Sequence, residues 1–177
     1  RDQLITNCAV TKIDPKNRIV NDTYQYDWLV TTIPWPAWRG WNVLPRDIDE
    51  AVGSLVHTSI DVDYCPTNEV TKSHWLYEPS KKISYHRILF RQNFCHQSRG
   101  YWTETNARRS GPADQFRHRN EFAYPVNTLG KPQAVARITQ WAAANHILPL
   151  GRWGTWEHMN SDVAVDLAMN AAHLFDA

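Results

Sequence analysis

Long apolar runs and an excess of either charge are missing from the sequence. No stretch approaches the roughly 18 to 20 apolar residues that a membrane-spanning helix needs. The formal net charge of +1 is too small to favour a nucleic acid or an acidic lipid as a partner. We therefore expect the chain to bind neither a membrane nor a nucleic acid.

Cysteine is scarce and unpatterned. Cys8, Cys65 and Cys95 stand far apart with no Cys-x-x-Cys pair, so they predict neither a disulfide framework nor a zinc site. An odd number of cysteines is typical of a reducing compartment, and we expect a cytoplasmic protein. The eight histidines are scattered without a recognisable ligand spacing, so no metal site is predicted.

A conventional start is also missing. Arg1-Asp2-Gln3 is neither an initiator nor a charged-then-apolar leader. We therefore expect residue 1 to be internal to a longer gene product.

Aromatic residues, in contrast, are abundant, with 9 Trp and 7 Tyr. Each of these rings combines a large apolar body with a polar handle. They serve in cores, in ligand clefts and as carbohydrate platforms, and composition alone does not choose among these uses. We expect most of these rings to pack in the core, because most aromatic area is buried in folded proteins.

The first third of the chain predicts strands and one helix. Residues 8–14 alternate as a half-exposed strand, residues 14–18 form a turn, and Ile19 begins a second arm. Residues 26–33 are nearly continuously apolar or β-branched, which favours a strand covered on both faces in a parallel sheet. A helix is expected over residues 46–55, directly after Pro45.

The middle of the chain predicts an antiparallel sheet. Its expected strands are residues 56–64, 73–77, 83–94 and 100–105, with a hairpin turn at 79–82. Residues 106–120 contain four arginines and are interpreted as a surface loop. Those arginines favour a solvated connection over an anion site.

Two helices are expected at the end, over residues 134–145 and 162–175. The second has an apolar stripe whose small alanines suit close packing on a sheet, and Asn160 and Ser161 supply its N-cap. The fold class is α/β (α+β): the chain leaves a parallel-sheet domain, builds an antiparallel one and returns.

The segment GRWGTWEHMNSD, residues 151–162, carries the strongest chemical signal. Gly151 and Gly154 let backbone approach a ligand closely, and Arg152 brings a planar cation. The free N–H groups at the start of the following helix point toward an anion or a hydroxylated chain. A cofactor site and an ordinary glycine loop beside a capped helix both fit these residues.

This segment resembles the FAD-contacting segment near the carboxyl end of UDP-galactopyranose mutases of the eukaryotic type. These flavoproteins are related to the amine oxidases and protoporphyrinogen oxidases. The resemblance extends to Trp75-Leu76-Tyr77 followed by Tyr85-His86-Arg87, and to Tyr124-Pro125. It also covers residues 27–34, so it spans nearly the whole chain in the family's order.

The resemblance implies roles for individual residues. Arg87 and two tyrosines would hold a substrate diphosphate, which needs a cation and hydroxyl donors. His158 stands in place of a substrate-contacting tyrosine and would bind phosphate or act as an acid or base, so Arg87 and His158 are the catalytic candidates. The implied cofactor contacts are Gly151, Arg152, Gly154, Asn160, Ser161, Asp162 and Val163. The implied substrate contacts are Tyr77, Arg87, Asn93, Tyr124 and His158.

The implied activity is isomerisation of a nucleotide-linked sugar through a flavin N5 adduct, with FAD as the nucleophile. Residues 1–36 and 149–177 would complete a Rossmann-like FAD domain, and residues 37–148 would form the substrate domain. The Gly-x-Gly-x-x-Gly turn that grips the ADP of FAD is absent, so a second chain or an amino-terminal piece would supply it. A flavin oxidase of the amine-oxidase type and a non-catalytic binding module remain alternatives.

Overall fold

The computed structural model describes residues 4–67, 69–113 and 116–175, and the chain divides into two compact units. The first unit comprises Arg1–Val56 and Pro125–Ala177, and the second unit comprises His57–Tyr124. The expected boundaries at residues 36 and 148 therefore differ from these units, because the helices expected in the substrate domain pack into the core of the first unit. Residues 1–3, on which the internal start is predicted, lie outside the described residues.

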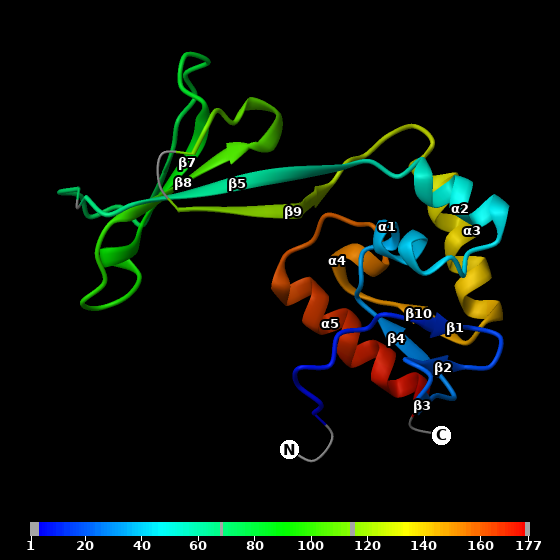
Figure 1. Cartoon of the computed structure of the whole chain (residues 1–177). Helices are drawn as coiled ribbons and strands as arrows, with labels where there is room; N and C mark the ends of the chain where they lie inside the picture. The colour runs from blue at the N-terminus through cyan, green and yellow to red at the C-terminus, as the bar shows by residue number, and fades with distance from the viewer. Residues whose placement is uncertain (1–3, 68, 114–115, 176–177) are drawn as a thin grey trace. The chain divides into compact units, whose positions relative to one another are not determined.

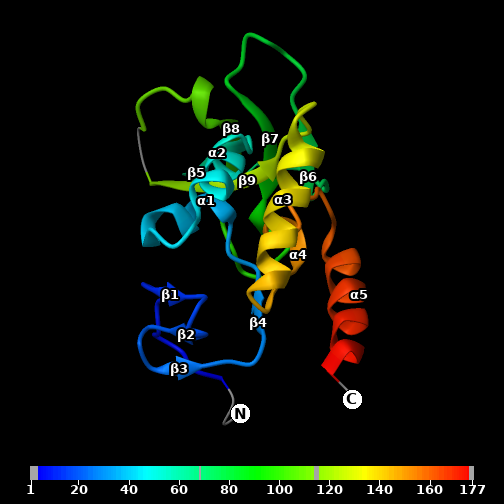
Figure 2. The same cartoon turned by 90° about the vertical axis from the view of Figure 1, so that its right-hand side faces the viewer.

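Short strands form two small sheets in the first unit. β1 (Ile13–Asp14), β2 (Ile19–Val20) and β3 (Tyr24–Gln25) make an antiparallel ribbon in that order, which is seen separately from β4 in Figure 2. β4 (Leu29–Thr31) pairs in parallel with β10 (Ile147–Pro149). The turn expected at residues 14–18 is found at residues 15–18, and the parallel strand is confirmed, although both the first arm and β4 are shorter than expected.

The two-faced burial expected of β4 is not observed in the described chain. Val30 is 46% exposed and Trp28, just before the strand, is 45% exposed. The sequence pattern requires a cover on both faces, but the described elements bury only one side of this strand.

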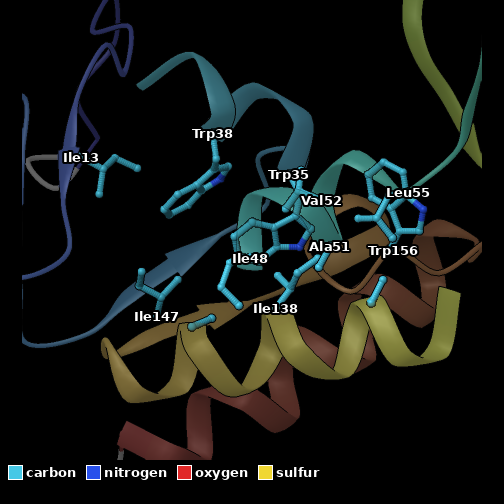
Figure 3. Packing of buried hydrophobic residues seen from close by; sticks show 12 residues of the cluster. Ile13, Trp35, Trp38, Ile48, Ala51, Val52, Leu55, Ile138, Ile147 and Trp156 are labelled. Atoms are coloured by element: carbon cyan, nitrogen blue, oxygen red, sulfur yellow. The ribbon is translucent and has the colours of Figure 1, made fainter. Parts of the chain in front are cut away.

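Helices build the core of the first unit. They are α1 (Trp35–Trp38), η1 (Arg39–Trp41), α2 (Arg46–Gly53), α3 (Lys131–Ala144) and α4 (Gly151–Gly154). Pro45 stands at the N-cap of α2, as predicted, because a proline needs no amide partner there. Figure 3 shows residues of α1, α2, α3 and β10 meeting in one cluster. Six of the nine tryptophans lie in this cluster or pack against it, which makes core packing their main use.

The last helix behaves differently from its prediction. α5 (Ser161–Ala172) and η4 (His173–Phe175) occupy the expected range, but no residue of α5 is buried. Asn160 is the N-cap residue and Ser161 is the first helical residue, and the Asn160 side chain makes no capping hydrogen bond. Figure 1 shows α5, in orange-red, within the first unit together with β4 and β10. Its exposed apolar residues include Val163, Val165 and Met169.

The second unit is a five-stranded sheet in the order β6-β7-β8-β5-β9. Its strands are β5 (His57–Cys65), β6 (Trp75–Tyr77), β7 (Tyr85–Phe90), β8 (Tyr101–Asn106) and β9 (Arg117–Pro125), with η2 (Arg91–Asn93) and η3 (Ala107–Arg109) between them. β7 pairs antiparallel with β6 and β8, and β8 with β5. The predicted mixed α/β class and the antiparallel sheet are confirmed.

The prediction of a loop over residues 106–120 is wrong at its carboxyl end, because β9 begins at Arg117. Arg117 and Arg119 form bidentate hydrogen bonds with Asp63 and Asp61 on β5, so two of the four loop arginines are strand residues that pair with carboxylates. Residues 114 and 115 of that expected loop lie outside the described residues. Hydropathy alone misses this strand because its residues are mostly polar.

Candidate functional site

The segment at residues 151–154 is a short helix, α4. Glycine is favoured at positions 151 and 154 for different physical reasons. Gly151 has φ +68, a left-handed conformation that favours glycine. A Cβ on Gly154 would lie 2.7 Å from the Thr31 carbonyl oxygen of β4. The absence of a Cβ at Gly154 therefore lets α4 pack closely on β4. The backbone that Gly154 approaches belongs to this chain.

The core fixes the position of α4. Trp35, 2% exposed, donates a hydrogen bond from Nε1 to the Gly154 carbonyl oxygen at 2.8 Å. The Leu150 N–H donates to the Thr31 carbonyl oxygen at 2.8 Å, so the chain entering α4 is tied to β4 as well. The segment expected to contact a cofactor is thus held from two sides.

Arg152 closes the turn between α4 and α5. Its Nη2 donates to the Met159 carbonyl oxygen at 2.6 Å, and the Glu157 N–H donates to the Arg152 carbonyl oxygen at 3.0 Å. The Arg152 side chain is half-buried. Its hydrogen-bond acceptor, Met159, directly precedes the N-cap residue of α5. Asn160, Ser161, Asp162 and Val163 follow as exposed residues at the start of α5, and His158 is exposed just before them.

Tyr77 and Arg87, which the sequence resemblance pairs, are directly opposite each other on β6 and β7. The Arg87 guanidinium carbon lies 5.9 Å from the centre of the Tyr77 ring. Burial alone lowers the pKa of Arg87, but the charge of Glu104 and hydrogen bonds with Glu104 and Tyr77 outweigh it and raise the pKa above its ordinary value. Arg87 is therefore a permanent cation on a half-exposed sheet face.

Tyr124 and Asn93 belong to the same unit. Tyr124 lies on β9, at the opposite edge of the sheet from β6, and its expected place beside the diphosphate site stays a prediction. Asn93 has a structural use, since its amide nitrogen donates to the carbonyl oxygens of Thr71 and Ser73 at 2.9 and 2.7 Å. These bonds hold the turn after β7 against the segment that leads into β6.

Glu104 is the residue that sequence reasoning missed. It is 8% exposed and accepts hydrogen bonds from Arg87 Nε at 2.7 Å and Nη2 at 2.6 Å. This fork fixes the plane of the guanidinium, which leaves its remaining N–H groups for another acceptor. The alternation of residues 100–105 places Glu104 on one face with Trp102, but only the register of β7 with β8 shows that this face carries Arg87.

The opposite face of the sheet carries a hollow of about 380 Å³ lined by residues that include Cys65, Tyr101 and Arg117. Cys65 and Tyr101 are paired across β5 and β8. A hydrogen bond from Tyr101 lowers the pKa of the Cys65 thiol, and the same contact raises the pKa of Tyr101 to about 12.

Tyr101→Phe is expected to slow alkylation of Cys65, because loss of the hydroxyl raises the thiol pKa and leaves less thiolate near neutral pH. The rate of iodoacetamide labelling at Cys65 against pH, read by peptide mass spectrometry, measures this. The exposed Cys8 and Cys95 serve as internal controls, and an unchanged Cys65 profile would contradict the assignment.

None of the described helices is long and apolar enough to cross a membrane. Among residues 4–67, 69–113 and 116–175, no group of three His, Cys, Asp or Glu side chains is arranged to hold a metal ion.

Comparisons with known proteins define the fold. No protein-family model and no curated sequence matches the chain. A crystal structure of reduced UDP-galactopyranose mutase matches with a TM-score of 0.66 and 15% identity, covering 84% of this chain and 41% of that one. A protoporphyrinogen oxidase-like protein from Exiguobacterium sp. 255-15 matches with a TM-score of 0.52 and 12% identity, covering 81% of this chain and 41% of that one.

These matches show that the chain has the fold found in the two flavoprotein types that the sequence resembles. The chain spans about two fifths of the length of either solved structure.

Proposed function

We propose that the chain is the C-terminal part of an FAD-dependent, mutase-like enzyme that isomerises a nucleotide-linked sugar. The observation that carries this proposal is the pair in the second unit in which Tyr77 lies opposite the permanent cation of Arg87, with Tyr124 proposed as the second hydroxyl donor. A diphosphate binds to such a set, because a guanidinium fork and hydroxyl donors match its oxygens. The fold shared with UDP-galactopyranose mutase supports the same class.

Each residue has a defined task in this proposal. Arg87 binds the diphosphate with the N–H groups that Glu104 leaves over, and Tyr77 donates from a side chain that is 66% exposed. His158, in the first unit, is proposed to bind a phosphate oxygen or to move a proton, because an imidazole carries both a donor and an acceptor nitrogen. Catalysis then rests on position and charge, because FAD supplies the nucleophile when it is bound.

The first unit fits an FAD molecule at the start of α5. The Asn160 side chain makes no hydrogen bond with the first amides of this helix. Such amides suit phosphate or ribityl oxygens. Arg152 lies beside them, held by the Met159 carbonyl oxygen. We assign the cofactor contacts to Gly151, Arg152, Gly154 and residues 160–163.

The FAD site requires a second polypeptide segment that carries the Gly-x-Gly-x-x-Gly turn. Two surfaces of the first unit support this part of the proposal. The parallel pair β4–β10 has only two strands in the described chain, whereas parallel sheets are normally larger and covered on both faces. α5 buries none of its residues and exposes Val165 and Met169 by 59% and 65%.

Arg87→Ala is expected to weaken binding of inorganic pyrophosphate by roughly tenfold or more, because a charge-assisted bidentate contact is lost. Isothermal titration calorimetry on the purified chain measures the affinity. Arg108→Ala, an exposed arginine of the same unit, changes the net charge equally and should have little effect. Tyr77→Phe removes one exposed hydroxyl without disturbing Glu104, so a defect in it cannot be attributed to misfolding. Equal pyrophosphate affinity in all variants would contradict the proposed diphosphate site.

Co-purification tests the cofactor and the partner. The intact assembly is expected to show visible flavin absorption and a mass that includes a dinucleotide-binding polypeptide. Arg152→Ala should lower the flavin content, and the exposed Arg46→Ala should leave it unchanged. Recovery of this chain alone from its native source, soluble and colourless, would contradict the proposal.

A further inference from the structure

Arg91, the first residue of η2, lies over two aromatic rings. Its guanidinium carbon is 4.9 Å from the centre of the Trp102 ring and 5.4 Å from that of the Tyr64 ring. Trp102 and Tyr64 are directly opposite each other on β8 and β5, so both rings lie on one face of the sheet. The Arg91 N–H donates to the Gly100 carbonyl oxygen at 3.2 Å. Ring contacts and backbone together hold a half-buried cation in one place.

The face that carries Arg91 also carries Arg87. Trp102 and Glu104 are two residues apart on β8, so their side chains point to the same face, about 7 Å apart along the strand. Arg87 binds Glu104, and Arg91 lies over Trp102. The two guanidiniums are therefore neighbours on this face, displaced from each other along β8.

Arg91 lacks the carboxylate partner that is usual for a half-buried arginine. Three other arginines of the second unit do pair with carboxylates, namely Arg87, Arg117 and Arg119. In the part of the chain that the structure describes, the Arg91 side chain forms no ion pair and donates no hydrogen bond. Stacking uses the flat face of a guanidinium and leaves its N–H donors, which lie in the plane, for an acceptor. A fixed cation with such donors fits an oxyanion.

We propose that Arg91 binds a second anionic group of the ligand whose diphosphate binds Arg87. This inference rests on the proposed function. The group is a carboxylate or a phosphate, since a guanidinium fork matches the oxygens of both. A displacement of two strand residues is longer than the step between adjacent phosphates, so the second anion is a separate group of the ligand. The ligand is thus a diphosphate compound with an additional acid on its sugar or its nucleoside.

The test compares two pairs of probes by isothermal titration calorimetry on the purified 177-residue chain. UDP-glucuronate and UDP-glucose differ by a carboxylate on the sugar. ADP with and without a 3′-phosphate differs by a phosphate on the nucleoside. The more acidic member of one pair is expected to bind about tenfold more tightly, because it gains a charge-assisted hydrogen bond. Arg91→Ala should abolish that preference and leave the affinity for the less acidic member unchanged.

Two further variants separate the charge of Arg91 from its packing. Arg91→Gln keeps most of the side chain and removes the charge, so it should lose the preference even if alanine disturbs the packing around Trp102. Arg91→Lys keeps the charge without the planar fork and should retain part of the preference. Arg108→Ala, at an exposed arginine of the same unit, changes the net charge equally and is the matched control.

The outcomes separate Arg91 from the diphosphate site. No preference for the more acidic member of either pair, or an equal preference in the wild type and Arg91→Gln, would overturn the inference. A uniform loss of affinity for all probes in Arg91→Gln would also overturn it, since Arg91 would then bind the diphosphate itself. If Arg87→Ala leaves the affinity for every probe unchanged while Arg91→Gln loses the preference, the proposed role of Arg87 fails and Arg91 still binds the additional acid.

Discussion

Gly154→Ala is expected to destabilise the first unit by about 3 kcal/mol and lower its melting temperature by roughly 10 °C. The added Cβ would lie 2.7 Å from the Thr31 carbonyl oxygen and 3.0 Å from the Pro149 carbonyl carbon. Both atoms are backbone, and the Thr31 oxygen already accepts a hydrogen bond from Leu150. Neither can move aside without disturbing β4 or β10. Differential scanning calorimetry measures the effect.

Gly40→Ala is the matched control for this change. Gly40 lies in η1 of the same unit, and nothing lies within 4 Å of the position that its Cβ would take. Alanine there should leave stability unchanged or raise it by about 0.4 to 1 kcal/mol, because the unfolded chain loses freedom. Equal melting temperatures for the two variants would show that α4 can shift on β4.

Arg119→Ala is expected to destabilise the second unit by about 3 kcal/mol at pH 7, because it leaves a buried carboxylate without its main partner. Asp61 is 0% exposed, and Arg119 Nε and Nη2 donate to its two oxygens at 2.7 and 2.8 Å. Arg117 Nη1, 3.8 Å from Asp61, compensates in part. Urea unfolding followed by fluorescence measures the loss.

The same pair gives stability a definite pH dependence. Hydrogen bonds from Arg119 lower the pKa of Asp61 from 3.8 to about 2 in the folded chain. A lowered carboxyl pKa stabilises the fold fully above the unfolded value near 3.8, and this contribution, about 2 kcal/mol, is lost as the pH falls through about 2. The difference between the wild type and Arg119→Ala should therefore shrink from pH 4 to pH 2. Arg108→Ala should track the wild type, and a constant difference would refute the assignment.

The sequence predicts those features of the fold that local pattern controls. Pro45 marks the start of α2, and the alternation of residues 56–64 predicts β5 to within one residue. The pairing of Tyr77 with Arg87 follows from a hairpin whose two arms are close in sequence. Each of these features depends on residues near one another in the chain.

Features that depend on distant partners are not predictable in this way. The local sequence around Arg117 and Arg119 suggests a solvated loop. Their carboxylate partners on the neighbouring strand, Asp63 and Asp61, are more than fifty residues away in the sequence. Glu104 gains its place beside Arg87 from strand register. Gly154 suggests room for a ligand, while the structure shows that its first neighbour is the Thr31 carbonyl oxygen. The roles assigned to His158 and residues 160–163 remain predictions.

The hydrogen bond from Trp35 to Gly154 has a consequence for how this protein changes over generations. Because one indole both fills the core and holds the segment with Arg152, a substitution at Trp35 alters folding and the position of the proposed cofactor contacts together. Selection for a different ligand thus cannot adjust this segment independently of the core. Diversification is left to exposed positions beside this segment, such as His158, where a substitution leaves the packing of the first unit intact.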